Sequence, residues 1–117
     1  MESYMHPHKR IFHELEYGIL SGRMRPGYHI PSIRTLAAQY QVNPNTVQRA
    51  ARELELEGLF ISHRGNGITV TEDTEMIRYL RQERANEVVR SFIEKMEALG
   101  YSHEQIEKYC ELANKTG

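Results

Sequence analysis

Residues 43–58 restrict the possible folds of this chain more than any other segment, because they predict a helix with a clearly marked start. Asn43 can act as the N-cap that accepts a hydrogen bond from a free backbone N–H, and Pro44 suits the first helical position. Gly58 marks the end of the helix. The residues expected on its buried face are Val47, Ala50, Ala51, Leu54 and Leu56. A helix with such a face must pack against neighbouring elements.

Two further helical patterns precede this segment. Residues 7–21 place apolar side chains every four positions, and Gly22 follows where a C-cap glycine belongs. Ser32 can cap a shorter second helix. The residues that this second helix turns inward are Leu36, Ala37 and Tyr40. Because residues 39–43 leave only a short connection, the second and third helices form a helix-turn-helix.

A β-hairpin is predicted directly behind the third helix. Two short β-prone runs, residues 59–61 and 68–70, flank a glycine-containing loop at residues 64–67. Three helices followed by a hairpin describe a winged helix-turn-helix, a mostly α fold with a small β-hairpin. We assign this module to residues 1–71.

The tail, residues 72–117, predicts a two-helix hairpin. Residues 73–99 carry a long helical pattern that ends at Gly100, and Ser102 with Gln105 has the form of a capping box for a final helix. Two such helices have too little surface to cover their apolar stripes, so we expect the tail to form a homodimer. The expected interface residues are Leu80, Val88, Val89, Phe92, Ile93, Met96, Ile106 and Tyr109.

The charge balance gives only a weak signal for a polyanionic partner. The chain has 15 Lys and Arg against 16 Asp and Glu, a net charge of −1. Residues 1–71 hold 8 basic and 6 acidic residues, which gives +2, and residues 72–117 hold 7 and 10, which gives −3. A modest basic excess is also typical of an ordinary solvated surface.

The composition argues against several classes of protein. No run approaches the roughly 18 apolar residues of a membrane span, and no apolar signal region opens the chain, so we expect a soluble, cytoplasmic protein without a membrane partner. Cys110 has no second cysteine to pair with and is expected to be a small buried apolar residue. The His6-x-His8 pair lacks the further ligands of a metal site, so neither metal nor cofactor is predicted. The sequence shows no nucleophile with a matched base, no paired carboxylates and no phosphate loop, so an enzyme is not predicted.

The third helix carries hydrogen-bonding side chains near its start, which suits contact with DNA. A helix fits the major groove, which is roughly 12 Å wide, and its N-terminal residues then face the base edges. The hairpin glycines let the backbone approach the sugar-phosphate edge closely. We interpret His63, beside Arg64, as a phosphate contact. Arg49 stays open between a DNA contact and an ion pair with Glu53 one turn further on.

Several ordered blocks of the sequence resemble the GntR family of bacterial transcription regulators. They are residues 19–27 (ILSGRMRPG), 30–37 (IPSIRTLA), 42–50 (VNPNTVQRA), 53–55 (ELE), 57–59 (EGL) and 64–70 (RGNGITV). The resemblance covers about residues 8–71. The short tail looks like that of the YtrA-type branch rather than a large effector-binding or aminotransferase-like domain. This resemblance implies a homodimeric repressor that binds a pseudo-palindromic operator, often of a transporter operon.

The resemblance also implies roles for individual residues. Arg34 matches the arginine that reaches DNA from the second helix, Asn43, Asn45, Thr46 and Gln48 match base and phosphate positions, and Arg64 with Gly65 matches the wing tip in the minor groove. The full set expected at DNA is Ser32, Arg34, Asn43, Asn45, Thr46, Gln48, Arg49, His63, Arg64, Gly65 and Gly67. The departures from the family pattern are Pro44 for a DNA-contacting arginine, Gln41 for a turn glycine and Tyr28 for an acidic residue, with Asn66 at the wing as a mild variation.

Two other functions stay open at this point. The chain can instead be a winged-helix protein-interaction module that uses its long tail helix, although the third helix presents polar rather than apolar residues. It can also be a sensor that an unidentified small-molecule effector switches. The sequence gives neither the operator nor the effector.

Overall fold

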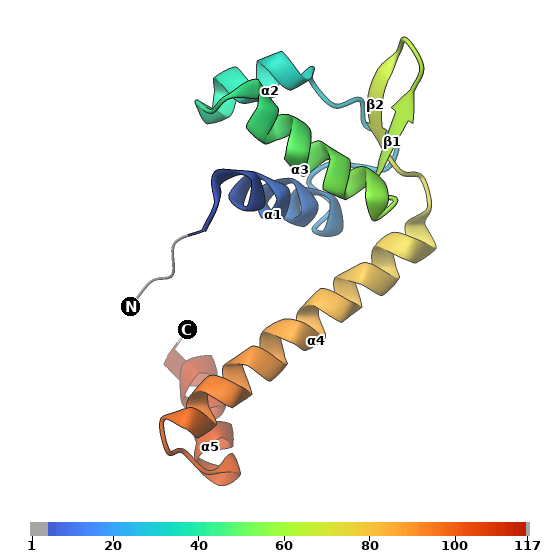
Figure 1. Cartoon of the computed structure of the whole chain (residues 1–117). Helices are drawn as coiled ribbons and strands as arrows, with labels where there is room; N and C mark the ends of the chain where they lie inside the picture. The colour runs from blue at the N-terminus through green and yellow to red at the C-terminus, as the bar shows by residue number, and fades with distance from the viewer. Residues whose placement is uncertain (1–4, 117) are drawn as a thin grey trace. The chain divides into compact units, whose positions relative to one another are not determined.

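The computed structural model describes residues 5–116, which form five helices and one antiparallel hairpin (Figure 1). The elements are α1 (Pro7–Leu20), α2 (Ile33–Tyr40), α3 (Pro44–Leu56), β1 (Phe60–His63), β2 (Gly67–Val70), α4 (Thr74–Ala98) and α5 (His103–Thr116). They divide into two compact units between Arg81 and Gln82, within α4. The first unit therefore holds α1 to α3, the hairpin and the start of α4, and the second holds the rest of α4 and α5.

The predicted helix starts of the first unit are confirmed. The Ser32 hydroxyl accepts a hydrogen bond from the Thr35 N–H at 3.1 Å, and Asn43 Oδ1 accepts one from the Asn45 N–H at 2.8 Å. Pro44 occupies the first turn of α3. These bonds satisfy N–H groups that the first turn of a helix leaves without intrahelical partners.

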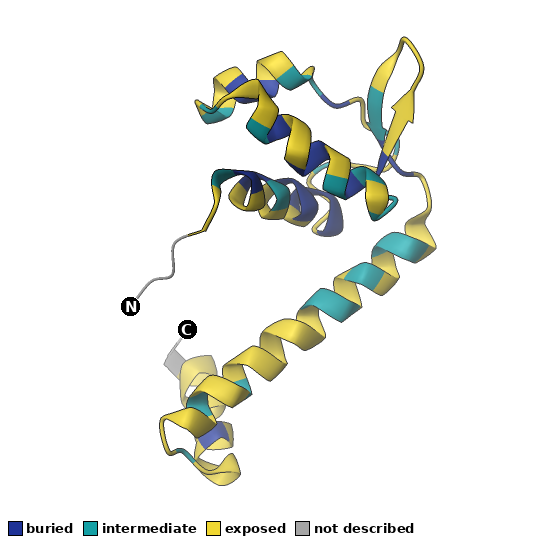
Figure 2. Ribbon diagram, in the orientation of Figure 1, coloured by how far each residue is buried: buried dark blue, intermediate teal, exposed yellow. Residues whose placement is uncertain are grey.

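The core of the first unit lies among α1, α2, α3 and the hairpin, as the buried positions in Figure 2 show. Its buried members are Ile11, Leu15, Ile19, Ile30, Leu36, Ala37, Val47, Ala50, Ala51, Leu54, Leu59, Phe60 and Val70. Burying one Val, Leu, Ile or Phe side chain stabilises the fold by about 1.5–3 kcal/mol. Met76, Ile77 and Leu80 of α4 pack on this core, which is why the first unit extends beyond the sequence boundary drawn at residue 71.

The prediction that Leu56 is buried is wrong, since its side chain is 82% exposed. Successive helical residues are about 100° apart, so Leu56 lies about 200° around α3 from the buried Leu54 and faces solvent. Glu16 is the opposite case: the apolar pattern did not single it out, and it is fully buried in α1.

The wing, defined as β1, β2 and their loop, is slightly longer than predicted. Phe60 pairs with Val70 and His63 with Gly67, so the loop is residues 64–66 instead of 64–67. The pairing reaches Gly67 because backbone φ +78°, a value that glycine readily adopts, lets that residue close the ladder. A further bridge joins His29 to Thr69 and fixes the base of the wing to the segment before α2.

The second unit has very little core. The predicted capping box is confirmed: the Ser102 N–H donates to Gln105 Oε1 at 2.8 Å, and the Gln105 N–H donates to the Ser102 hydroxyl at 3.2 Å. Among the side chains described in this unit, Ile106 alone is buried. The prediction that Cys110 is buried is wrong, because within one chain α5 has only α4 to pack against and the thiol is exposed.

Candidate nucleic-acid interface

Apart from the exposed Leu56 at its last turn, α3 buries its large apolar side chains and exposes polar ones. Val47 and Leu54 are completely buried, whereas Asn43, Asn45 and Gln48 are exposed and Thr46 is half-buried. Asn43 uses Oδ1 for the cap, which leaves its side-chain N–H groups to donate elsewhere. The start of α3 thus presents side-chain donors and acceptors to solvent, the combination that binds phosphate and base edges, while the backbone N–H groups of Asn45 and Thr46 are bonded to Asn43.

α2 contributes an exposed arginine next to its cap. Ser32 is exposed, but its hydroxyl is engaged, since it lies 2.9 Å from the Thr35 hydroxyl and also accepts from the Thr35 N–H. Arg34 follows in the first turn and is exposed. The structure therefore gives Ser32 a structural role in starting α2 and leaves Arg34 available to a partner.

The wing tip is exposed, and two of its glycines have positive φ angles. The Asn66 N–H donates to the His63 carbonyl at 2.8 Å and closes a tight turn with Gly65 at φ +76°. Arg64 is exposed in this turn. At Gly67 an added Cβ would lie 3.1 Å from His29 Cε1, so both its φ and its surroundings favour glycine. His63 Nε2 lies 2.8 Å from the Thr69 hydroxyl, which holds the imidazole across the two strands.

The arginines of this surface keep their charge available. Within residues 5–116, Arg34, Arg49 and Arg64 form no ion pair with a carboxylate, so the alternative pair of Arg49 with Glu53 is not formed. Arg49 instead acts on His8 of α1. Burial lowers the pKa of His8 below its ordinary value of 6.5, and the positive charge of Arg49 lowers that pKa further.

The conformation of Gln41, a departure from the family pattern, is not predicted by the local sequence pattern. Gln41 ends α2 with φ 58° and ψ 48°, the left-handed region that glycine adopts at low cost. The turn between α2 and α3 therefore has the backbone that a glycine would provide, with a glutamine in its place. The signal was the short connection into α3, which requires a left-handed residue to reverse the chain.

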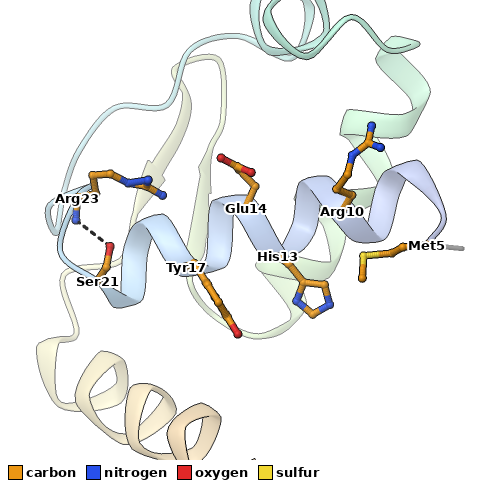
Figure 3. Close-up of a pocket in the computed structure, with 7 residues that line it drawn as sticks. All are labelled: Met5, Arg10, His13, Glu14, Tyr17, Ser21 and Arg23. Atoms are coloured by element: carbon orange, nitrogen blue, oxygen red, sulfur yellow. Dashed lines mark hydrogen bonds between the residues drawn. The ribbon is translucent and has the colours of Figure 1, made fainter. Parts of the chain in front are cut away.

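A separate hollow of about 740 Å³ lies along the outer side of α1 (Figure 3). It is lined by Met5, Arg10, His13, Glu14, Tyr17, Ser21 and Arg23. Figure 3 shows Arg10 and Glu14 on one side of the helix and His13 and Tyr17 on the other, so the polar groups do not converge. None of the residues expected at DNA lines this hollow. Among residues 5–116, no three His, Cys, Asp or Glu side chains are arranged to hold a metal ion.

The second unit exposes most of the predicted dimer residues. Val88, Val89, Phe92 and Tyr109 are exposed, Ile93 and Met96 are half-buried, and Ile106 is buried within its own chain. Leu80 lies in the first unit and packs on its core. A groove of about 570 Å³ between α4 and α5 is lined by residues that include Val89 and Phe92. No helix among the described residues combines the length and apolar character needed to cross a bilayer.

Comparison with known proteins places these features in context. The chain is 33% identical over 97 residues to the HTH-type transcriptional regulator YhcF of Bacillus subtilis (strain 168), a match that covers 83% of this chain and 80% of YhcF. It is 39% identical over 66 residues to the HTH-type transcriptional repressor YtrA of the same organism, covering 56% of this chain and 51% of YtrA.

Two solved structures extend the comparison. A GntR family transcriptional regulator from Listeria monocytogenes superposes with a TM-score of 0.87 and 32% identity, covering 95% of this chain and 97% of that one. The AraR DNA-binding domain in complex with operator ORR3 gives a TM-score of 0.57 and 27% identity, over 61% of this chain and 86% of that domain. The winged helix-turn-helix with C-terminal helices predicted from the sequence is confirmed by these likenesses.

The family model for bacterial regulatory proteins of the gntR family matches residues 7–70, more than half of the chain. The members of this family are transcriptional regulators and not enzymes. The matched segment begins with α1 and ends with the wing, so it contains every residue of the candidate interface. The chain therefore belongs to the GntR family and is a DNA-binding transcriptional regulator.

Proposed function

We propose that the protein is a homodimeric repressor that binds a pseudo-palindromic operator and represses an operon. The observation that carries this proposal is that α3 buries Val47, Ala50, Ala51 and Leu54, while the Asn43 cap and its first turns present polar side chains to solvent. A helix that served as a protein-interaction surface would expose a continuous apolar face, whereas α3 exposes one large apolar residue, Leu56, at its last turn. The relative YtrA is a repressor, and the AraR domain is bound to an operator, which supports both parts of the proposal.

In this proposal three elements of the first unit contact DNA. α3 lies in the major groove with Asn45, Thr46 and Gln48 toward the base edges, and Arg34 reaches DNA from α2. Arg64 at the wing tip enters the adjacent minor groove, where Gly65 and Gly67 allow a close backbone approach. Arg49 is included because it forms no ion pair within the described chain. Asn43, His63 and the backbone around Ser32 contribute phosphate contacts.

The dimer forms through the tail. The apolar side chains of α4 and α5 are exposed in one chain, and a second copy of the same tail presents a matching surface. A two-fold axis then places the two half-sites about one helical turn of DNA apart, which is about 34–36 Å, or a multiple of that distance apart. Because its operator is DNA of the cell, we place the action of the protein in the cytoplasm. The YtrA-type branch that the tail resembles suggests that the target is a transporter operon.

The test is binding to the DNA upstream of the protein's own gene. Fluorescence anisotropy titrations compare this duplex with a scrambled duplex across a series of salt concentrations. We expect a preference of about 10³-fold or more for the native duplex and a steep fall of affinity with salt. Equal, weak binding to both duplexes would refute the operator and point to the long helix α4 as a protein-binding surface.

A small-molecule effector is a second element of the proposal. The grooves between α4 and α5, of about 570 and 400 Å³, are of the size that holds small ligands and are lined largely by apolar side chains. Thermal unfolding with candidate metabolites tests this idea, because a ligand that binds only the folded state raises the melting temperature. Melting temperatures that no candidate raises would favour a repressor without an effector.

A further inference from the structure

The wing tip contains the one Asn-Gly pair of the sequence, Asn66-Gly67. Asparagine followed by glycine is the most reactive setting for spontaneous loss of the side-chain amide, because glycine has no Cβ to obstruct the approach of its backbone nitrogen to the asparagine side chain. Asn66 is exposed, and within residues 5–116 its side-chain amide makes no hydrogen bond that would hold it in place. The backbone of Asn66 is turned tightly by the bond from its N–H to the His63 carbonyl.

The other asparagines of the chain are placed less favourably. Asn43 precedes Pro44, whose nitrogen carries no N–H and cannot attack. Asn45, Asn86 and Asn114 lie within α3, α4 and α5, where helical geometry keeps the next backbone nitrogen away from the side chain. Gly67, in contrast, forms the last pair of the β1–β2 ladder, where local opening costs little free energy.

We propose that Asn66 is a site of slow self-modification that releases the wing from DNA. The backbone nitrogen of Gly67 attacks Cγ of Asn66, a new C–N bond forms, and the side-chain nitrogen leaves as ammonia with the proton that Gly67 gives up. Water then opens the resulting ring at either carbonyl and yields aspartate or isoaspartate. The step needs no oxidant or reductant and no reactant other than water.

The position of Asn66 converts this chemistry into a change of DNA affinity. The product carries a negative charge two residues from the exposed Arg64, at the surface that faces phosphates in the proposed function. Isoaspartate also lengthens the backbone by one atom within the turn that Asn66 closes at 2.8 Å. Both effects weaken the wing contact, so a molecule loses its operator as it ages. This consequence, though not the chemistry, rests on the proposed function.

The experiment ages the purified full chain at mildly alkaline pH and follows each asparagine-containing peptide by mass spectrometry with an isoaspartate assay. We expect conversion at Asn66 and none above background at Asn45 or Asn86, which serve as internal controls. Conversion at Asn66 no faster than at Asn86 would overturn the proposal. Asn66→Gln is the matched variant, because the longer side chain closes its ring far less readily; Gly67→Ala is unsuitable because of the positive φ and the contact with His29.

DNA binding decides the consequence separately. Fresh wild type and Asn66→Gln, whether fresh or aged, should bind the operator alike, while aged wild type and fresh Asn66→Asp should bind about tenfold more weakly, which corresponds to about 1.4 kcal/mol. An Asn66→Asp variant that binds as tightly as wild type would overturn the regulatory role. If fresh wild type fails to distinguish the operator from a scrambled duplex, the proposed function fails, whereas the peptide masses still decide the chemistry.

Discussion

Thirteen buried residues from three helices, the hairpin and the segments beside them form one continuous core in the first unit, whereas the described side chains of the second unit bury Ile106 alone. Val88 and Leu112 of the second unit are 56% and 58% exposed, values far from those of core residues. The first unit therefore has the internal packing that a stable domain needs, and the second has apolar surface that needs a cover. Apolar periodicity therefore identifies a face but not the surface that covers it.

The largest expected effect tests the core of the first unit. Leu54→Ala should lower the free energy of unfolding by about 2–5 kcal/mol, because Leu54 is completely buried and its truncation leaves a cavity. Chemical denaturation measures the change. The matched control is Leu56→Ala, two residues further along α3, which should change stability by less than about 0.5 kcal/mol because Leu56 is exposed. Equal effects of the two variants would contradict the division of α3 into two faces.

The second prediction concerns the exposed face of the tail. Phe92→Ala should weaken self-association by about 2 kcal/mol or more if Phe92 lies at the centre of the dimer interface. Analytical ultracentrifugation over a range of concentrations measures the dissociation constant. Glu94→Ala, on the opposite face of α4, should leave it unchanged. A wild-type chain that sediments as a monomer at all concentrations would show that something other than a second copy covers this surface.

The third prediction addresses the DNA surface of the first unit. Arg64→Ala should reduce operator affinity by about 1–3 kcal/mol if the guanidinium makes a bidentate base contact, with no change in self-association. If Arg64 contacts phosphate instead, the loss should be uniform across sequences and the salt dependence should fall by about one counterion. Arg78→Ala is the control, since Arg78 is exposed and pairs with Glu75 at 3.6 Å in α4. A loss below about 0.3 kcal/mol, small against the usual value of such a contact, would remove Arg64 from the interface.

The connection between α2 and α3 gives a smaller effect of opposite sign. Gln41→Gly should raise the free energy of unfolding by about 1 kcal/mol, because glycine adopts the left-handed conformation of this residue without the cost that a side chain brings. Gln41→Ala keeps a Cβ and should be close to neutral. Thermal or urea denaturation measures both. A destabilising Gln41→Gly would show that the glutamine side chain makes a compensating contribution to the turn.

Most of the first unit could be predicted from local rules. Asn43 with Pro44 and Ser32 with Leu36 mark helix starts and buried positions that the structure confirms, because caps and apolar spacing act within a few residues. The predicted burial of Leu56 is wrong because this residue lies about 200° around α3 from Leu54 and faces solvent. The left-handed Gln41 and the contact of His29 with Gly67 arise from backbone geometry and from segments far apart in sequence, which no local pattern encodes.

Burial in the tail, residues 72–117, could not be predicted from apolar spacing. Its stripe from Met76 to Met96 has helical spacing, yet Met76 packs on the core of the first unit while Phe92 stays exposed. The apolar spacing of α5 likewise predicts a buried Cys110, whereas its thiol is exposed. Spacing reports that a face is apolar, whereas burial depends on a partner surface, and within one chain α5 has only α4. The DNA-contacting and dimer residues remain predictions for the experiments above.

The smallest expected effect is a change in how stability depends on pH, which we assign to the buried His8 and not to the exposed His103. Burial and the charge of Arg49 lower the pKa of His8, so its folded-state pKa lies below the ordinary value of 6.5 in the unfolded chain. Between these two pKa values the unfolded state binds more protons, and the free energy of unfolding must therefore fall as pH drops below about 6.5 and level off below the folded pKa. His8→Gln should remove this part of the pH dependence, while His103→Gln, at the exposed start of α5, should retain it. Urea denaturation from pH 8 to pH 5 measures the slopes, and an unchanged slope in His8→Gln would show that the packing of α1 against α3 does not depend on a neutral imidazole.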